Sequence, residues 1–392
     1  MTGSDMIKKS LQKNSMLIAL VVLMLLFQAL ILVTGRGSLF DPLNISNIIS
    51  QNAYVVILAT GMLLCILTGG NIDLSVGSVV AMVGALAGTL IVNMHLNVYV
   101  SIILCLMAGI CIGAWQGFWI AFIRIPAFIV TLTGMLLWRG VALLILNGLT
   151  ISPFPDEYLR YFTSFVPNLE DKAAVMAITI AIGTVACVIF IAVSVAGRIK
   201  KLRRNYAVES SVFFIARTVL ISAVVMLLSW LLSMNKGFPV ILILLVVIVL
   251  GYSYYTQKTV PGRYLYAMGG NEKAARLSGI NTDKVLFFAY TNMGFLSAVA
   301  ALACVGRFNS ASPTAGTNYE MDAIGACYIG GASAYGGTGT VGGAVIGAIF
   351  MGVLNNGMSI MGIDANWQRV VKGLVLLFAV VFDVLSKKRV KN

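Results

Sequence analysis

The chain has 392 residues, of which 59% are hydrophobic and only 10% are charged, and its mean hydropathy is +0.95. A soluble globular protein has about 25% charged residues, so this composition excludes a soluble domain and predicts an integral membrane protein. The formal net charge of +13 lies in short runs beside hydrophobic segments, without interleaved aromatic residues. This placement argues against nucleic-acid binding and for membrane lipid as the surroundings.

Hydrophobic runs of about 18 residues or more recur along the whole chain and predict membrane-spanning helices. Twelve segments are predicted, over residues 16–33, 51–68, 75–93, 98–121, 126–146, 173–196, 212–233, 238–255, 285–306, 321–335, 338–361 and 367–385. Segment 321–335 is short for a span, so a broken or re-entrant element there stays open. The predicted fold is therefore all-α, a polytopic transmembrane helical bundle of about 10–12 spans that forms one domain over residues 1–392.

Positive charges predict which ends of these segments face the cytoplasm. Lys8, Lys9 and Lys13 precede the first segment, and further basic clusters lie at residues 198–204 and 387–391. Under the positive-inside rule these clusters are cytoplasmic. Both termini and residues 256–284 are then expected inside, and the loop 147–172 outside.

A charged stretch, GRYLYAMGGNEKAARLSGI, interrupts the hydrophobic pattern. Asn271 suits a helix N-cap, Glu272 suits the positive end of a helix dipole, and Gly279 suits a left-handed C-cap. We predict a short helix from Glu272 to Ser278 within a cytoplasmic loop over residues 257–284. Such a helix either docks a soluble partner or belongs to an inert loop.

Two regions of the chain resemble each other, Gly61–Leu86 and Gly325–Ile349. Each has a hydrophobic segment that is interrupted by glycines and followed by a helix rich in small residues. Glycine-interrupted segments at corresponding places of two halves are typical of a transport path. An internal duplication is therefore predicted, with chance similarity among the 39 glycines as the alternative.

Charged residues inside a bilayer are costly and usually functional. Five residues are candidates: Asp73, Arg124, Arg139, Asp322 and Lys372. Asp73 is expected to cap the helix that begins near Ser75 or to pair with an arginine. Asp322 is one candidate partner for Arg139.

A path for an uncharged polar solute needs amide, hydroxyl and aromatic groups. The candidate lining residues are Asn52, Asn71, Asp73, Trp115, Gln116, Trp119, Asn355, Asn356 and Gln368. The same amides could instead hold helices together. The sequence has no Walker A motif, no catalytic grouping, no CxxC pair and a single histidine, so we expect neither an enzyme nor a bound metal or cofactor.

Four blocks of sequence carry a family resemblance: GGNIDLSVGS, IPAFIVTLTGMLLWRG, GRYLYAMGGNEKAARLSGI and EMDAIGACYIGGASAYGGTGTVGGAVIGA. Together and in this order they resemble the ribose/xylose/multiple-sugar permease family of ATP-binding-cassette (ABC) importers. The resemblance runs from about Asn44 to Asp383. The long middle of the chain is more similar to the xylose and multiple-monosaccharide branch.

The resemblance implies the permease subunit of an ATP-driven importer in a bacterial cytoplasmic membrane, working by alternating access on a monosaccharide such as xylose, galactose, arabinose or glucose. It implies a cytoplasmic ABC ATPase subunit, an extracytoplasmic sugar-binding protein and a second permease copy. ATP would be used by the ATPase subunit. The alternative from the residues is a stand-alone secondary carrier for a small polar solute.

The family element Ala-Ala-x-x-x-Gly, which docks on the ATPase, matches Ala274, Ala275 and Gly279. The resemblance therefore assigns ATPase coupling to Asn271, Glu272, Lys273, Ala274, Ala275, Arg276 and Gly279. The family has glutamate directly before the two alanines, whereas this chain has Lys273 there and Glu272 one position earlier. Either side chain is a candidate for the ATPase contact.

Overall fold

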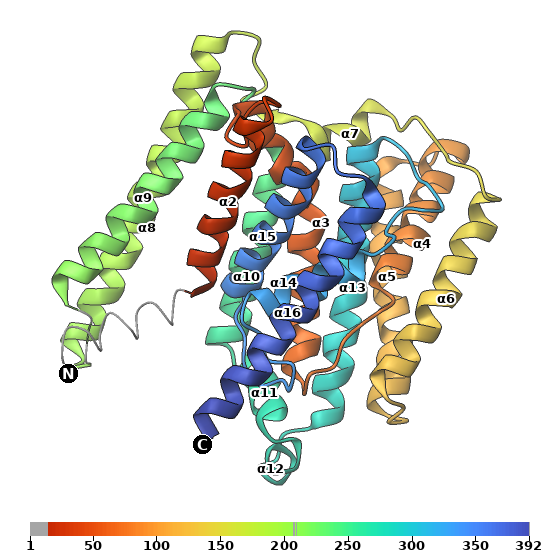
Figure 1. Ribbon diagram of the computed structural model, residues 1–392. Coiled ribbons are helices and arrows are strands. Elements are labelled where there is room, and N and C mark those ends of the chain that lie inside the picture. The colour runs from red at the N-terminus through yellow and green to blue at the C-terminus, as the bar shows by residue number, and fades with distance from the viewer. Residues whose placement is uncertain (1–14, 207, 209, 392) are drawn as a thin grey trace. The chain divides into compact units, whose positions relative to one another are not determined.

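The computed structural model describes residues 15–206, 208 and 210–391. The predicted basic cluster at Lys8, Lys9 and Lys13 lies outside the described residues, as do the side chains of the cluster at 387–391. The described part is almost entirely helical, which confirms the all-α class (Figure 1). Ten helices in this part are long and apolar enough to cross a membrane, within the range expected from the sequence.

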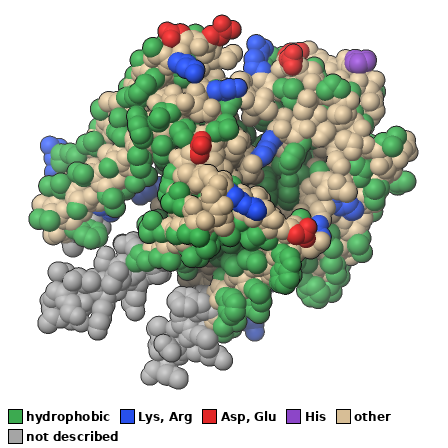
Figure 2. Space-filling view, turned by 45° about the horizontal axis from the view of Figure 1, so that its top comes forward, with side chains coloured by type: hydrophobic (Ala, Val, Ile, Leu, Met, Phe, Trp, Pro, Cys, Tyr) green, Lys and Arg blue, Asp and Glu red, His purple; other side chains and the backbone are tan. Residues whose placement is uncertain are grey.

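These ten helices are α2 (Ser15–Val33), α3 (Pro42–Leu67), α4 (Val76–Gly88) with its π-helical continuation η1 (Thr89–Asn93), α5 (Val98–Ala121), α6 (Ala127–Leu146), α8 (Lys172–Arg203), α9 (Ser211–Ser233), α10 (Val240–Lys258), α13 (Thr282–Phe308) and α15 (Val341–Ile360). The other helices are α7 (Asp156–Thr163), α11 (Val260–Gly270), α12 (Glu272–Leu277), α14 (Tyr319–Ile329) and α16 (Ala365–Lys391). The surface seen in Figure 2 is mostly hydrophobic, with few charged side chains, as a surface facing lipid requires.

The segment 321–335 does not form a span. Helix α14 has only 11 residues, a length of about 16 Å, and its last turn closes at Gly330 and Gly331. Gly331 has a φ of +87°, which a glycine adopts without steric cost. Of the forms left open by the sequence, the structure shows a short helix that breaks at these glycines, and the chain passes into α15 through residues 330–340.

The chain divides into two compact units. The smaller unit comprises Phe40–Ile49 and Ser164–Val240, with helices α8 and α9 side by side (Figure 1). At their contact, a side chain at Gly183 would collide with Ser229, and the Cys187 thiol donates to the Ser222 carbonyl oxygen at 3.6 Å. A short antiparallel pair, β1 (Phe165–Val166) and β2 (Phe238–Pro239), joins the two ends of this hairpin. Helix α8 extends beyond the predicted segment, so the basic residues at 198–203 belong to its last turns.

The larger unit comprises residues 1–39, 50–163 and 241–392 and is built around α3 and α13, whose spanning windows are each 72% buried. Small residues let α5 and α13 approach closely. A methyl group on Gly109 would lie 2.5 Å from the Ala298 side chain, and one on Gly113 would lie 2.5 Å from the Tyr290 carbonyl oxygen. Backbone approach at small residues is the usual means of helix packing in a membrane.

All six cysteines are free thiols. Five of them are buried, whereas Cys111 is exposed on α5.

Candidate functional site

The first turns of α4 and α14 meet inside the larger unit. A side chain at Gly77, the second residue of α4, would collide with the Gly316 carbonyl oxygen and lie 2.6 Å from the Glu320 carboxylate. Gly316 has a φ of +72° and is equally close to the backbone of Gly77. Two helix N-termini, which are the positive ends of helix dipoles, therefore face each other, separated only by glycines.

The two helices run away from this meeting point toward opposite ends of the unit. At the end of α4, a methyl group on Gly88 would lie 3.0 Å from Ala311 and 3.3 Å from Ile151. At the end of α14, Gly330 packs on Gly343. Each helix is preceded by a non-helical stretch, residues 68–75 before α4 and the turns of residues 309–318 before α14. Non-helical backbone at this depth is tolerated where protein surrounds it, and it marks the binding region of many transporters.

Asp73 and Gln116 come together at the start of α4. The Asp73 carboxylate accepts the Ser75 amide at 2.8 Å and the Ser75 hydroxyl at 2.6 Å. The N-cap of α4 is Ser75, without a side-chain cap bond, so the predicted capping by Asp73 is wrong, because Asp73 stands two positions before the N-cap and holds Ser75 instead. The Gln116 amide of α5 donates to the Ser75 hydroxyl at 2.7 Å. All three residues are buried.

Two further charged groups surround α14. The Lys372 ammonium of α16 lies 3.0 Å from the Asp322 carboxylate, which also accepts the Tyr54 hydroxyl at 2.6 Å. Arg139 of α6 instead donates to the carbonyl oxygens of Pro313, at 2.8 Å, and Ala315. The suggested pairing of Arg139 with Asp322 is therefore wrong, because backbone carbonyls in the turns before α14 take the bonds of Arg139.

We call Asp73, Ser75, Gln116, Arg139, Glu320, Asp322, Lys372 and Tyr54 the polar centre. Glu320 is 8% exposed and interacts electrostatically with Arg139, Asp322 and Asp73. Glu320, Tyr54 and Ser75 were missed by the sequence analysis. Glu320 could have been found from its position in the sequence. It is an acidic residue soon after a glycine, at the start of a short helix within an apolar region.

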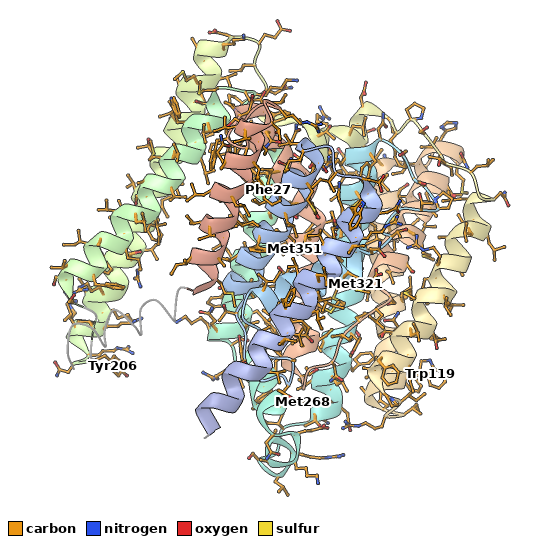
Figure 3. The ribbon with its side chains drawn as sticks, in the orientation of Figure 1. Phe27, Trp119, Tyr206, Met268, Met321 and Met351 are labelled. Atoms are coloured by element: carbon orange, nitrogen blue, oxygen red, sulfur yellow. The ribbon has the colours of Figure 1, made fainter. Side chains whose placement is uncertain are left out.

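The remaining predicted path residues do not lie in the polar centre. The Asn52 amide donates to the Ala348 carbonyl oxygen at 2.5 Å and thereby holds α3 to α15. Trp115 packs edge-on against Trp119 and Trp138, and Figure 3 shows Trp119 well apart from Met321 of α14. Asn71 bonds to Thr68, Asn355 and Asn356 lie in α15, and Gln368 bonds to the Ile363 carbonyl oxygen at 2.9 Å.

The helix predicted at residues 272–278 is present as α12. The Asn271 side chain accepts the Ala274 amide at 3.0 Å, and Gly279 takes a φ of +86°, so both predicted caps are confirmed. The expected loop 257–284 also contains α11, which the sequence analysis missed. Thr259 caps α11 and Pro261 lies in its first turn, a common start signal. Asn271 ends α11 and begins α12, so the two helices are joined without a spacer.

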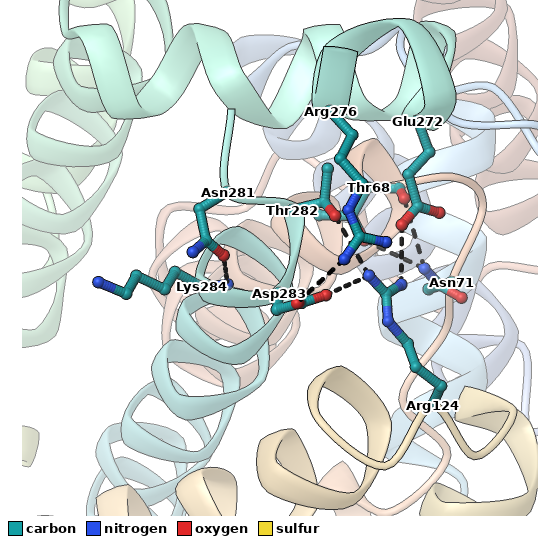
Figure 4. A network of polar contacts seen from close by, with 9 residues as sticks. All are labelled: Thr68, Asn71, Arg124, Glu272, Arg276, Asn281, Thr282, Asp283 and Lys284. Atoms are coloured by element: carbon teal, nitrogen blue, oxygen red, sulfur yellow. Dashed lines mark hydrogen bonds and ion pairs between the residues drawn. The ribbon is translucent and has the colours of Figure 1, made fainter. Parts of the chain in front are cut away.

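Arg124 attaches α12 to the rest of the unit, as Figure 4 shows. It lies in the turn between α5 and α6 with a φ of +64°, outside any candidate span, so its assignment as an intramembrane charge is wrong. Its guanidinium lies 2.7 Å from the Glu272 carboxylate and also contacts Asp283 and Thr282. Partial burial alone would lower the pKa of Arg124, but Glu272 and Asp283 outweigh it, so the pKa is raised.

The outward face of α12 carries different residues. Leu277 is 90% exposed, and Lys273, one turn earlier, is exposed on the same side. Arg276 is largely exposed and lies 3.8 Å from Asp283. Ala275 is buried, whereas Ala274 is exposed.

Comparison with known proteins identifies a family. Residues 44–167 and 165–380 match the family described as Branched-chain amino acid transport system / permease component. The chain is 37% identical over 380 residues to the Xylose transport system permease protein XylH of Escherichia coli (strain K12), covering 97% of this chain and 93% of that protein. No solved structure matches the chain significantly.

Two other relatives are similar over nearly the full length. XylH of Haemophilus influenzae is 37% identical over 381 residues, covering 97% of this chain and 98% of that protein. The Ribose import permease protein RbsC of Escherichia coli (strain K12) is 34% identical over 376 residues, covering 96% of this chain and 95% of that protein.

Proposed function

The chain belongs to the family described as Branched-chain amino acid transport system / permease component, and from this premise we propose that it is the membrane permease of an ATP-driven monosaccharide importer. The observation that carries the proposal is the identity of 37% with XylH across 97% of the chain. Because a xylose and a ribose permease are both similar to this chain, a pentose is the first sugar to test. The protein would form the path through a bacterial cytoplasmic membrane, with both termini in the cytoplasm.

The polar centre supports a transport role. Two helix N-termini, the non-helical backbone that precedes them, and buried amide and carboxylate groups meet between α4 and α14. Such groups can exchange hydrogen bonds with sugar hydroxyls when neighbouring helices separate, which is the basis of alternating access in transporters with interrupted helices. The path in this proposal therefore includes Asp73 and Gln116, whereas Asn52 serves helix packing.

The energy source in this proposal is a separate ABC ATPase subunit that binds α12. The observation behind it is the outward face of α12, where Leu277 and Lys273 are exposed while Glu272 is paired with Arg124. We therefore assign the ATPase contact to Lys273 and Leu277, and an internal anchoring role to Glu272. An extracytoplasmic sugar-binding protein and a second permease copy complete the proposed importer.

The test begins with purification of the tagged chain from its native host in mild detergent. A stoichiometric ABC ATPase subunit should accompany it. Uptake of D-xylose by cells should survive proton and sodium ionophores while ATP lasts and should stop when ATP is depleted. A chain that emerges alone, with uptake abolished by an ionophore, would instead establish the stand-alone secondary carrier.

A further inference from the structure

Three segments that are distant in sequence meet at the end of α11, and all of them present glycines. A side chain at Gly269 would collide with the Leu67 carbonyl oxygen, at the end of α3, and with the Gly337 amide, in the turn between α14 and α15. The Gly337 amide also donates to the same Leu67 carbonyl oxygen at 3.1 Å. We call Gly69, Gly70, Gly269, Gly336 and Gly337 the glycine junction.

Backbone touches backbone throughout this junction. Gly336, with a φ of +82°, packs on Gly69, and a side chain at Gly70 would collide with the Ala334 carbonyl oxygen. Because no side chain lies between these segments, no rotamer change can absorb a displacement of one segment relative to another. A movement of α11 must therefore move the ends of both neighbouring segments.

A side-chain hydrogen bond adds a second link beside the junction. The Tyr266 hydroxyl of α11 donates to the Gly339 carbonyl oxygen at 3.0 Å, directly before Thr340, which caps α15. The hydroxyl also interacts with the Thr256 side chain. Helix α11 is thus attached to the start of α15 as well as to the end of α3.

The segments that leave the junction lead to the polar centre. Six positions after Leu67 the chain reaches Asp73, which accepts the amide of Ser75, the N-cap of α4. In the other direction, residues 330–340 connect α15 back to α14, which carries Asp322. At the opposite end of α11, Asn271 passes directly into α12.

We propose that Gly269 and Tyr266 are positioning residues that transmit the movement of α12 to residues 68–75 and 330–340. Through these residues the movement reaches the start of α4 and the end of α14. The inference rests on the proposed function, since it requires an ATPase that moves α12. Beyond the proposed function, the inference names the residues through which the movement of α12 reaches the transport path. Tight helix packing alone would predict glycines here without any effect on coupling.

The chain offers a matched control for the test. Gly270 is adjacent to Gly269 in the last turn of α11, but an added methyl group there meets no atom within 4 Å. Gly269→Ala and Gly270→Ala therefore make the same chemical change in the same helix turn, and only the first disturbs the junction. Tyr266→Phe removes the hydroxyl bonds while keeping the ring, and Tyr264→Phe is its partly exposed control.

The measurement uses the complete complex that co-purifies with the chain, in proteoliposomes with its sugar-binding protein and D-xylose. The quantity compared is xylose transported per ATP hydrolysed, because a loss of folded protein lowers uptake and ATPase activity together and leaves this ratio unchanged. We expect Gly269→Ala to retain the ATPase subunit but lower the ratio by about fivefold or more, within the usual range of allosteric coupling. Gly270→Ala should match the wild type, and Tyr266→Phe should lower the ratio by a smaller factor.

Wild-type ratios in both Gly269→Ala and Tyr266→Phe would overturn the inference and leave the junction as packing only. If Gly269→Ala fails to assemble, the ratio for Tyr266→Phe decides, and a wild-type value there also overturns it. Failure of the proposed function gives a different result from failure of this inference. In that case no ATPase would co-purify with the wild-type chain, and its uptake would not depend on ATP.

Discussion

The Arg124 guanidinium and the Glu272 carboxylate lie 2.7 Å apart and join the turn between α5 and α6 to the first turn of α12. Both side chains keep part of their surface in solvent, and Arg124 also contacts Asp283 at the start of α13. The pair therefore fixes the orientation of α12 more than it contributes to stability, since exposed ion pairs contribute about 0–1 kcal/mol. It is the reason why the proposal assigns the ATPase contact to Lys273 and Leu277 and not to Glu272.

We expect Leu277→Asp to prevent the ATPase subunit from co-purifying, because it places a charge where the exposed leucine would enter a groove of the partner. Removing a central apolar contact typically costs about 2 kcal/mol, or about 30-fold in affinity. Glu272→Gln should weaken the complex by no more than about fivefold, in line with an exposed pair. The amount of ATPase bound per permease measures both effects. If Glu272→Gln loses more ATPase than Leu277→Asp, Glu272 and not Leu277 makes the ATPase contact.

Gly279 permits a charge test at the C-cap of α12. Its φ is +86°, and an added side chain meets no atom within 4 Å, so space is not limiting. Asn and Asp both tolerate the left-handed conformation and have nearly the same shape, so they differ mainly in charge. We expect Gly279→Asp to remain folded in the membrane but to uncouple xylose uptake from ATPase activity, while Gly279→Asn keeps most of the coupling. Normal uptake by Gly279→Asp would contradict docking at this helix.

The glycines at the second positions of α4 and α15 provide a further comparison. A methyl group on Gly77 would collide with the Gly316 carbonyl oxygen, whereas one on Gly342 meets no atom within 4 Å. Gly77→Ala should therefore lower the yield of folded protein and the remaining uptake. Gly342→Ala should be neutral or stabilising by up to about 1 kcal/mol, because alanine is the better helix former. Size-exclusion chromatography in detergent, followed by uptake, measures both, and equal yields of the two variants would contradict the close meeting of α4 and α14.

Lys372 is expected to be needed because it neutralises Asp322. Lys372→Met leaves a carboxylate that is only 1% exposed without its cation, and breaking such a pair typically costs about 3–5 kcal/mol. Adding Asp322→Asn should recover much of the stability, since the amide still accepts the Tyr54 hydroxyl. Thermal unfolding in detergent is the measurement, with the exposed Arg369→Met on the same helix as control. A double variant no more stable than Lys372→Met would show that the charge pair is not the cause.

Features that depend on nearby residues could be predicted from the sequence. The caps of α12 at Asn271 and Gly279 are confirmed because each involves contacts within a few positions. The cap predicted at Asp73 is wrong, because the helix begins two positions later, at Ser75, than an N-cap at Asp73 requires. The presence of ten candidate spans and the break after α14 follow equally from local hydrophobicity and glycine content. The internal duplication stays a prediction, although both proposed repeats have the expected helix, glycine turn and helix.

Features that depend on distant segments were not predictable. No feature of the sequence indicated that Arg139 would bind the backbone carbonyls of residues 313 and 315, which lie in the turns before α14. Arg124 lies between the predicted segments 98–121 and 126–146, but its partners Glu272 and Asp283 are 148 and 159 positions away and could not be inferred from a local pattern. The path residues were chosen by side-chain type, and only Asp73 and Gln116 among them converge, because helical phase decides which amides face the interior.

The pairing of Asp322 with Lys372 also has a consequence for how the protein is made. The two residues are 50 positions apart, and Lys372 lies in α16. During synthesis, α14 leaves the ribosome before its counter-charge exists, and a buried carboxylate without its cation is strongly unfavourable. Packing of α14 into the larger unit should therefore wait for α16. Nascent chains that end before α16 should remain susceptible to membrane proteases.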